Sequence, residues 1–306
     1  MRGMMRLTLC WIALGLASRA HAEKPGVSGL ARIRPGEYIG VFDHKRGESG
    51  PRLASVRIRK DGSARVRGRD LGRTGNAGEP SDLEAACVLE GLPGEALVLE
   101  SGEDGPSARL FHLVGISAKD WAPRVAGIAE VAAHAGKQNL EGLVCVTSAP
   151  RRALVIFGER GGSSHHPEGR LRWAQLDLAA HALEWTQSGR TGLAVRAPAG
   201  WESDAGARAI SDLHLDASGT LWAGATLDPG DAGPFRSAIY ALARAQLDAD
   251  PPLRLVENPR VAFSLDGFKV EGIAAPPGDG AFLAIATEDE DLGGAVRTLA
   301  RPQHQR

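Results

Sequence analysis

A five-fold internal repeat limits the architectures open to this chain more than any other feature. Five heptapeptides align without gaps, and each has a polar second residue near the head of an apolar run. They are VSGLARI (27–33), LEAACVL (83–89), LEGLVCV (140–146), ISDLHLD (210–216) and VEGIAAP (270–276). Their second residues are separated by 56, 57, 70 and 60 positions. A period of this size is typical of propellers and solenoids.

Each copy continues with further short apolar runs bounded by glycine, proline, aspartate or serine. The second runs are EYIGVFD, EALVLES, ALVIFGE, TLWAGAT and AFLAIAT, and the third are PRLASVRI, ARLFHLV, RLRWAQL, SAIYALA and GAVRTLA. Runs of this length are typical of strands buried on both faces. Three or four antiparallel strands repeated five times predict an all-β fold, a five-bladed β-propeller. The alternative, a β-sandwich, does not explain the polar residue that heads every first strand.

Two irregularities interrupt the repeat. Residues 188–209 form a loop-rich insertion that accounts for the longest interval. A fourth run is visible in the first four copies, whereas the fifth copy ends without one. We therefore expect the ring to be closed weakly or by packing alone.

The first 22 residues have the three zones of a secretory signal peptide, namely MRGMMR, LTLCWIALGLA and SRAHA. The apolar zone of about eleven residues is short for a bilayer, which needs roughly 20. We expect cleavage after Ala22 and a single domain over residues 23–306, with a retained membrane anchor as the alternative. The protein is then periplasmic or secreted, and the excess of arginine over lysine favours a bacterial periplasm.

Charge and hydropathy exclude two classes of partner. Removing residues 1–22 takes three arginines from the 36 basic residues and none from the 37 acidic ones, which leaves a net charge of −4. A mature chain with a net negative charge is not expected to bind nucleic acid. No second apolar stretch of the mature chain is long enough to span a membrane.

Cys87 and Cys145 remain after processing, in a compartment that favours disulfides. Both lie in first strands, of the second and third copies. Because alternate residues of a strand face opposite sides, the two cysteines can face each other across adjacent blades. The sequence leaves open a disulfide between blades two and three or two buried free thiols.

The polar residues of the repeat are expected to form a ring around one mouth of the central channel. In a propeller, the start of the first strand and the end of the second strand lie on the same face of the disc. This places Ser28, Glu84, Glu141, Ser211 and Glu271 together. Three converging carboxylates raise one another's pKa unless a cation compensates them. Ca²⁺ accepts such oxygen ligands, so we predict a calcium site; alternatively, each residue caps the backbone of the neighbouring blade.

The order Ser, Glu, Glu, Ser, Glu resembles the soluble calcium-activated nucleotidases, which are apyrase-type five-bladed propellers. The segments NLEGLVCVTSAPRRALVIFGER, ISDLHLD and FKVEGIAA are similar to the family's third, fourth and fifth blades. The first blade, VSGLARIRPGEYIGVFDHKRG, is also similar to the phytase-like propellers described as having esterase activity. The resemblance implies a calcium ion held in the channel by the ring residues.

The chain also departs from this family. FDHKRG stands where the family has Asp-Asp-Arg-Thr-Gly, which keeps Asp43 and a displaced Arg46, and Leu140 replaces an aromatic residue. One hypothesis is a calcium-dependent phosphoanhydride or phosphoester hydrolase of nucleotidase or phytase-like type. Arg46 and Arg160 are its candidate substrate-binding residues for a small phosphorylated substrate, and Asp43 or Asp228 is the candidate base. The alternative is a non-catalytic propeller with structural calcium that binds a glycan, a peptide or a cell-envelope partner.

Overall fold

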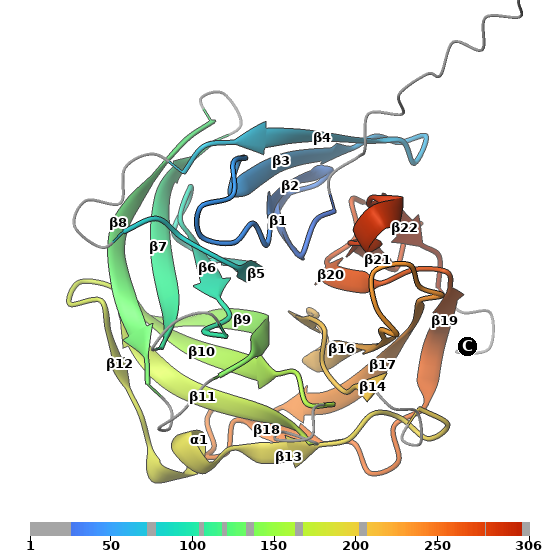
Figure 1. The fold of residues 1–306 in the computed structure, drawn as a ribbon. Coiled ribbons are helices and arrows are strands. Elements are labelled where there is room, and N and C mark those ends of the chain that lie inside the picture. The colour runs from blue at the N-terminus through green and yellow to red at the C-terminus, as the bar shows by residue number, and fades with distance from the viewer. Residues whose placement is uncertain are drawn as a thin grey trace, which may run out of the picture.

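A computed structural model describes residues 26–71, 78–103, 107–117, 121–132, 138–162, 168–201, 207–278 and 280–301. The predicted signal peptide lies outside the described residues. Within them, five antiparallel sheets surround a common centre, which confirms the five-bladed propeller (Figure 1). No described helix has both the length and the hydrophobicity of a membrane span.

Each blade follows one copy of the repeat. Blade 1 contains β1 (Gly29–Arg34), β2 (Glu37–Val41), β3 (Leu53–Ile58) and β4 (Ala64–Arg69). Blade 2 contains β5 (Leu83–Val88), β6 (Ala96–Glu100), β7 (Ala108–Ile116) and β8 (Trp121–Val131). Blade 3 contains β9 (Leu140–Ala149), β10 (Arg152–Glu159), β11 (Gly169–Asp177), β12 (Ala182–Glu184) and β13 (Leu193–Val195).

Blade 4 is the largest sheet and blade 5 the smallest. Blade 4 contains β14 (Ala207–Arg208), β15 (Leu213–Leu215), β16 (Thr220–Leu227), β17 (Arg236–Ala245), β18 (Leu253–Leu255) and β19 (Val261–Asp266). Blade 5 contains β20 (Val270–Ala274), β21 (Leu283–Thr287) and β22 (Val296–Leu299). Two short helices complete the described chain, α1 (Gln187–Thr191) and the 3₁₀ helix η2 (Glu290–Leu292).

The hydrophobic core is divided among the interfaces between blades. Five clusters of buried side chains each join residues of two neighbouring blades. Because both faces of every inner strand are covered, the strands read as continuous apolar runs and not as alternating ones. The burial of β6 and β21, in which every residue is buried, shows this directly.

The described parts of the insertion, residues 188–201 and 207–209, contain more secondary structure than the sequence indicates. Its first part continues α1 and adds β13 to the edge of β11, and its last part adds β14 to β16. These strands of two or three residues are too short to show a periodic pattern. The insertion therefore extends two sheets, and β14 brings Arg208 to the channel.

The ring is closed between blades 5 and 1 by hydrogen bonds as well as by packing. The Val27 backbone N–H donates to the Thr287 carbonyl (3.2 Å), beside the end of β21. The Tyr38 hydroxyl donates to the Ala275 carbonyl (3.0 Å) and Arg32 donates to the Pro276 carbonyl (2.7 Å). Blade 5 has three strands, as the repeat indicated, but its junction with blade 1 is not made by packing alone.

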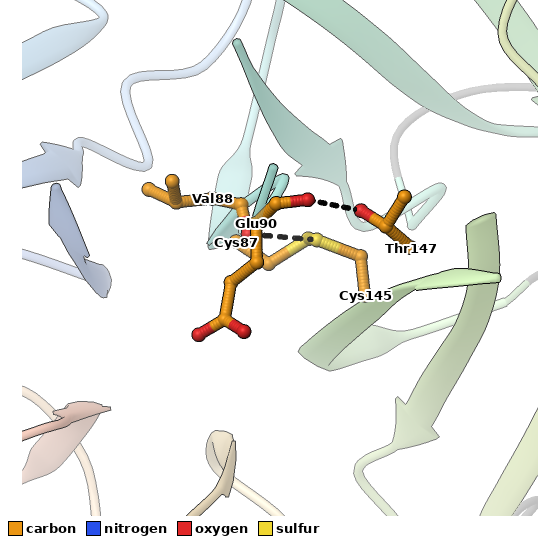
Figure 2. The surroundings of a disulfide bond; sticks show 5 residues. All are labelled: Cys87, Val88, Glu90, Cys145 and Thr147. Atoms are coloured by element: carbon orange, nitrogen blue, oxygen red, sulfur yellow. Dashed lines mark hydrogen bonds between the residues drawn. A yellow bond between two sulfur atoms is a disulfide. The ribbon is translucent and has the colours of Figure 1, made fainter. Parts of the chain in front are cut away.

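A disulfide joins Cys87 of β5 to Cys145 of β9. The sequence left open a disulfide or two free thiols at these positions, and the structure contains the disulfide. Figure 2 shows the bond crossing from blade 2 to blade 3, with the Thr147 hydroxyl donating to the Glu90 carbonyl nearby (2.6 Å). The bond connects two channel strands 58 residues apart, and their Cα atoms are separated by 5.9 Å. It fastens one inter-blade junction covalently.

Candidate functional site

The three glutamates of the repeat share one backbone irregularity. In blade 2, Leu83 pairs with Glu100 and Ala85 with Leu99, so Glu84 has no partner across the strand. The register skips Glu141 in β9 and Glu271 in β20 in the same way. A β-bulge leaves its extra residue unpaired and re-aims the side chain. These three channel strands therefore each have, at their second residue, a glutamate that does not follow the regular alternation of the strand.

The residue after the bulge decides how closely two blades approach. A Cβ atom on Gly272 would lie 2.9 Å from Ala286 Cβ and 3.0 Å from Leu30 Cβ. A Cβ atom on Gly29, after Ser28, would lie 2.6 Å from the Glu84 carbonyl oxygen. These contacts are shorter than carbon and oxygen atoms tolerate, so glycine is needed where the inner wall is most crowded.

Basic side chains of the protein compensate two of the three glutamates. Glu141, 3% exposed, receives a hydrogen bond from Arg160 Nη1 at 3.2 Å. Glu271, 2% exposed, has its Oε1 atom 3.0 Å from Lys269 Nζ and 3.5 Å from Arg208 Nη1. The Glu271 Oε2 atom is buried and has no hydrogen-bond partner among the described residues.

Arg208 and Lys269 also hold Asp228, a residue of the loop after β16. Arg208 Nη2 donates to Asp228 Oδ2 at 2.6 Å, and Lys269 Nζ lies 3.7 Å from the same oxygen. Burial opposes ionisation of Asp228, but Arg208, the Gly230 backbone N–H and Lys269 outweigh it and lower the pKa of Asp228. Asp228 is therefore an ionised carboxylate at the mouth.

Glu84 has the least compensation of the mouth carboxyl groups. Its side chain keeps some exposed surface, yet it forms no hydrogen bond or ion pair with another described residue. Burial raises the pKa of Glu84 well above its ordinary value, and the neighbouring carboxylates, led by Glu141 and Asp82, raise it further. Burial and the neighbouring carboxylates therefore disfavour the charged form of Glu84.

Two further acidic residues at the mouth have raised pKa values. Burial is the main cause at Glu288, and the Glu271 and Asp43 carboxylates add to it. Burial is also the main cause at Asp212, against hydrogen bonds from the Ile273 and Leu213 backbone N–H groups. Asp212 Oδ1 is a second buried oxygen without a partner among the described residues.

The two serines of the predicted ring differ from each other. Ser28 Oγ donates to Glu288 Oε2 at 3.3 Å, so Ser28 belongs to the acidic cluster. Ser211 Oγ donates to the Val270 carbonyl oxygen at 2.7 Å, and Ser211 is fully buried. Ser211 thus caps the backbone of the neighbouring blade, as the alternative interpretation of the repeat predicted for all five positions.

The remaining predicted residues lie at different distances from the cluster. Asp43 is close enough to raise the pKa of both Glu84 and Glu288. Arg46 is exposed and makes no hydrogen bond or ion pair with another described residue, so it does not join the cluster. Across the described ranges, no three His, Cys, Asp or Glu side chains are arranged to hold a metal ion.

The acidic mouth, as we name this cluster, contains more carboxyl groups than cations. Its described carboxyl residues include Asp43, Asp82, Glu84, Glu141, Asp212, Asp228, Glu271, Glu288 and Glu290, and three cations pair with members of this set, Arg160, Arg208 and Lys269. Sequence reasoning did not name Asp82, Arg208, Asp212, Lys269, Glu288 or Glu290 as site residues. Lys269 and Asp212 each adjoin or nearly adjoin a repeat position, whereas nothing in the sequence around Arg208 indicated its place.

Comparisons with known proteins show the fold and no family. No protein-family model matches the chain, and no curated protein matches it significantly. A structure from the GH130 family of mannoside phosphorylases, which contains glycoside hydrolases that target β-1,2-mannosidic linkages in Candida mannan, is 12% identical with a TM-score of 0.55. That similarity covers 92% of this chain and 87% of the other.

Two enzymes from Bacteroides thetaiotaomicron have similar folds. An endo-arabinase is 12% identical with a TM-score of 0.52, covering 93% of this chain and 98% of the other. An endo-1,4-β-xylanase is 10% identical with a TM-score of 0.50, covering 90% and 94%. These similarities support the propeller fold over nearly the whole chain.

Proposed function

We propose that the protein is an exported hydrolase whose reaction centre is the acidic mouth and whose substrate is a glycan. One observation carries the proposal: an ion-paired carboxylate, Asp228, and a carboxyl group without a cation, Glu84, lie within electrostatic reach of the same guanidinium, Arg208. Hydrolysis of a glycosidic bond requires such a pair, one carboxyl group protonated and one ionised.

The surroundings of the pair suggest its roles. Glu84, crowded by carboxylates, would donate its proton to the glycosidic oxygen as the bond to the sugar breaks. Asp228, held ionised by Arg208 and Lys269, would accept a proton from the attacking water or attack the anomeric carbon itself. Asp43, beside Glu84, would then act electrostatically and not as the base.

The net charge of the mouth supports a glycan over a phosphorylated substrate. Carboxyl groups outnumber the three cations even when Glu84, Asp212 and Glu288, whose pKa values are raised, are counted as neutral. The remaining negative charge repels an anionic phosphate unless a metal ion is present, whereas a neutral sugar is not repelled. The carbohydrate-active enzymes among the similar folds agree with this choice.

A substrate panel with matched variants tests the proposal. The mature chain is assayed on arabinan, xylan, β-1,2-mannan and aryl glycosides, and in parallel on nucleoside di- and triphosphates and phytate. We expect turnover of a glycan, and Glu84→Gln or Asp228→Asn should lower kcat/KM by about 10²–10⁴-fold, the usual range for a lost acid or base.

The control is Asp61→Asn, which removes an exposed carboxylate from the turn between β3 and β4 and should leave turnover unchanged. Folded protein that cleaves no glycan, or full activity in both mouth variants, contradicts the proposal. Turnover of phosphorylated substrates alone favours the phosphohydrolase hypothesis.

A calcium ion at the same mouth is a second candidate, favoured by the excess of carboxyl groups and by the unpartnered Glu271 Oε2. The described carboxyl groups are not already arranged around a metal ion, so Glu84, Glu141 and Glu271, with Ser28 as a further oxygen, would have to turn toward it to be its ligands. Ser211 is engaged by the Val270 carbonyl. Such an ion supplies a site for phosphate oxygens and lowers the pKa of bound water. Arg160, on Glu141, is then the nearest described anchor for an anion.

Thermal unfolding with Ca²⁺ and with chelator tests the calcium site. At a Ca²⁺ concentration of about 100 Kd, binding adds roughly 2.7 kcal/mol, which raises Tm by about 4–5 °C in a domain of this size. Glu271→Gln should remove most of this rise. The site is excluded if neither Ca²⁺ nor chelator changes Tm and elemental analysis finds no metal. A calcium-dependent Tm without any turnover favours the non-catalytic propeller.

A further inference from the structure

The outer hairpin of blade 1 is strongly basic although the chain as a whole is not. Residues 57–69 contain five arginines, one lysine and one aspartate, a net charge of +5. Since the whole chain has a net charge of −1, the rest of it carries −6. The charge is therefore concentrated in one hairpin, formed by β3 and β4.

The strand register places four of these arginines on one face. Arg65 pairs with Arg57, Arg67 with Ser55 and Arg69 with Leu53. Side chains two residues apart on a strand point to the same side, about 6.7 Å apart, so Arg65, Arg67 and Arg69 form a row about 13 Å long with Arg57 beside it. We name this set the arginine row.

The chain itself compensates the arginine row only in part. Arg57, whose side chain is 67% exposed, lies 3.0 Å from Glu37, which Arg34 also contacts at 2.8 Å. Arg69 Nε donates to Ser55 Oγ at 3.1 Å. Exposed Arg65 and Arg67 have no ion pair with a described residue. Like charges directly opposite on two strands are destabilising, and Arg65 lies directly opposite Arg57.

The row lies on the flank of the disc. Leu53 and Ile39, on the same face of the blade nearer the channel, pack with blade 2 in one hydrophobic cluster. The arginine row continues that face outward to the edge strand β4, at the rim in Figure 1. A line of guanidinium groups along one strand fits a linear polymer better than the broad plane of a membrane.

We propose that the arginine row binds a linear anionic polysaccharide, with a carboxylate of successive sugars on each guanidinium. Arginine suits this ligand because its planar group can make two parallel hydrogen bonds to a carboxylate. This binding surface is separate from the acidic mouth and does not depend on the reaction proposed there.

Fluorescence anisotropy with a fluorescein-labelled oligogalacturonate of about ten sugars tests the surface, with the full mature chain in 50 mM salt. Arg65→Glu with Arg67→Glu should weaken binding about thirtyfold, because two charge-assisted contacts are reversed. Arg65→Lys with Arg67→Lys keeps the charge and should weaken it only a fewfold. Arg254→Glu with Arg260→Glu makes the same charge change on exposed residues of blade 4 and should have no effect.

Binding should also fall as salt rises and be absent for neutral dextran. No binding of the oligogalacturonate, or an equal loss in the blade 4 control, overturns the proposal. So does binding only to vesicles with phosphatidylglycerol or only to duplex DNA. A further outcome also overturns it: the charge-reversal variant aggregates, and the lysine variant binds with wild-type affinity at both high and low salt. The arginines then serve only to protect the edge strand.

Discussion

Replacing Arg208 with methionine is expected to lower the free energy of unfolding by about 3–5 kcal/mol at neutral pH, as removal of one partner from a buried ion pair does. Methionine keeps the length of the side chain but removes the charge. Asp228 and Glu271 then share Lys269 as their nearest cation. Denaturant unfolding of both proteins at pH 7 measures the difference.

The loss should depend on pH in one direction. The pKa of Asp228 is lowered in the folded protein, so its ionisation stabilises the fold above the pKa of unfolded aspartate, about 3.9. That contribution disappears as pH falls through the lower, folded pKa. The difference between wild type and Arg208→Met should therefore be complete at neutral pH and shrink below about pH 4.

Arg196→Met is the matched control, because Arg196 pairs with Glu168 at 3.2 Å on the surface. Surface ion pairs contribute about 0–1 kcal/mol. An Arg208 variant as stable as this control, or a difference that grows toward acid pH, would show that Arg208 does not hold the acidic mouth together.

Replacing Cys87 and Cys145 together with alanine should produce the second large effect. A bond that closes a loop of 58 residues restricts the unfolded chain by about 4 kcal/mol in the chain-entropy model. For a chain of this size the loss corresponds to a fall in Tm of roughly 7 °C. Differential scanning calorimetry of both proteins, without reductant, measures it.

Reductant provides the internal control for the disulfide. Wild-type protein in dithiothreitol should melt near the double variant, and the double variant should not respond to dithiothreitol. A wild-type Tm that is unchanged by complete reduction would mean that the packing of blades 2 and 3 suffices without the bond. Both outcomes are read from the same instrument and the same buffer.

The sequence predicted the propeller because its physical cause is local. A channel strand covered on both faces must be apolar throughout, and five such strands at similar spacing can share one axis. The same repeat located Glu84, Glu141 and Glu271, since a polar residue that recurs at one place in every blade has to meet its counterparts there. It also placed Cys87 and Cys145 in adjacent channel strands, close enough to bond.

The tertiary structure decided how those glutamates are used. Arg208 reaches them from β14, a two-residue strand within an insertion, and its pairing with Asp228 joins this strand to the loop after β16. Ser28 and Ser211 occupy equivalent repeat positions, yet one contacts a carboxylate and the other a backbone carbonyl. The sequence by itself determined which strands form the wall of the channel, because each buried strand is a run of apolar residues and these runs recur along the chain. Only the folded ring decided which charges meet at the acidic mouth, because ion pairs form between groups that are close in space and produce no repeating pattern in the sequence.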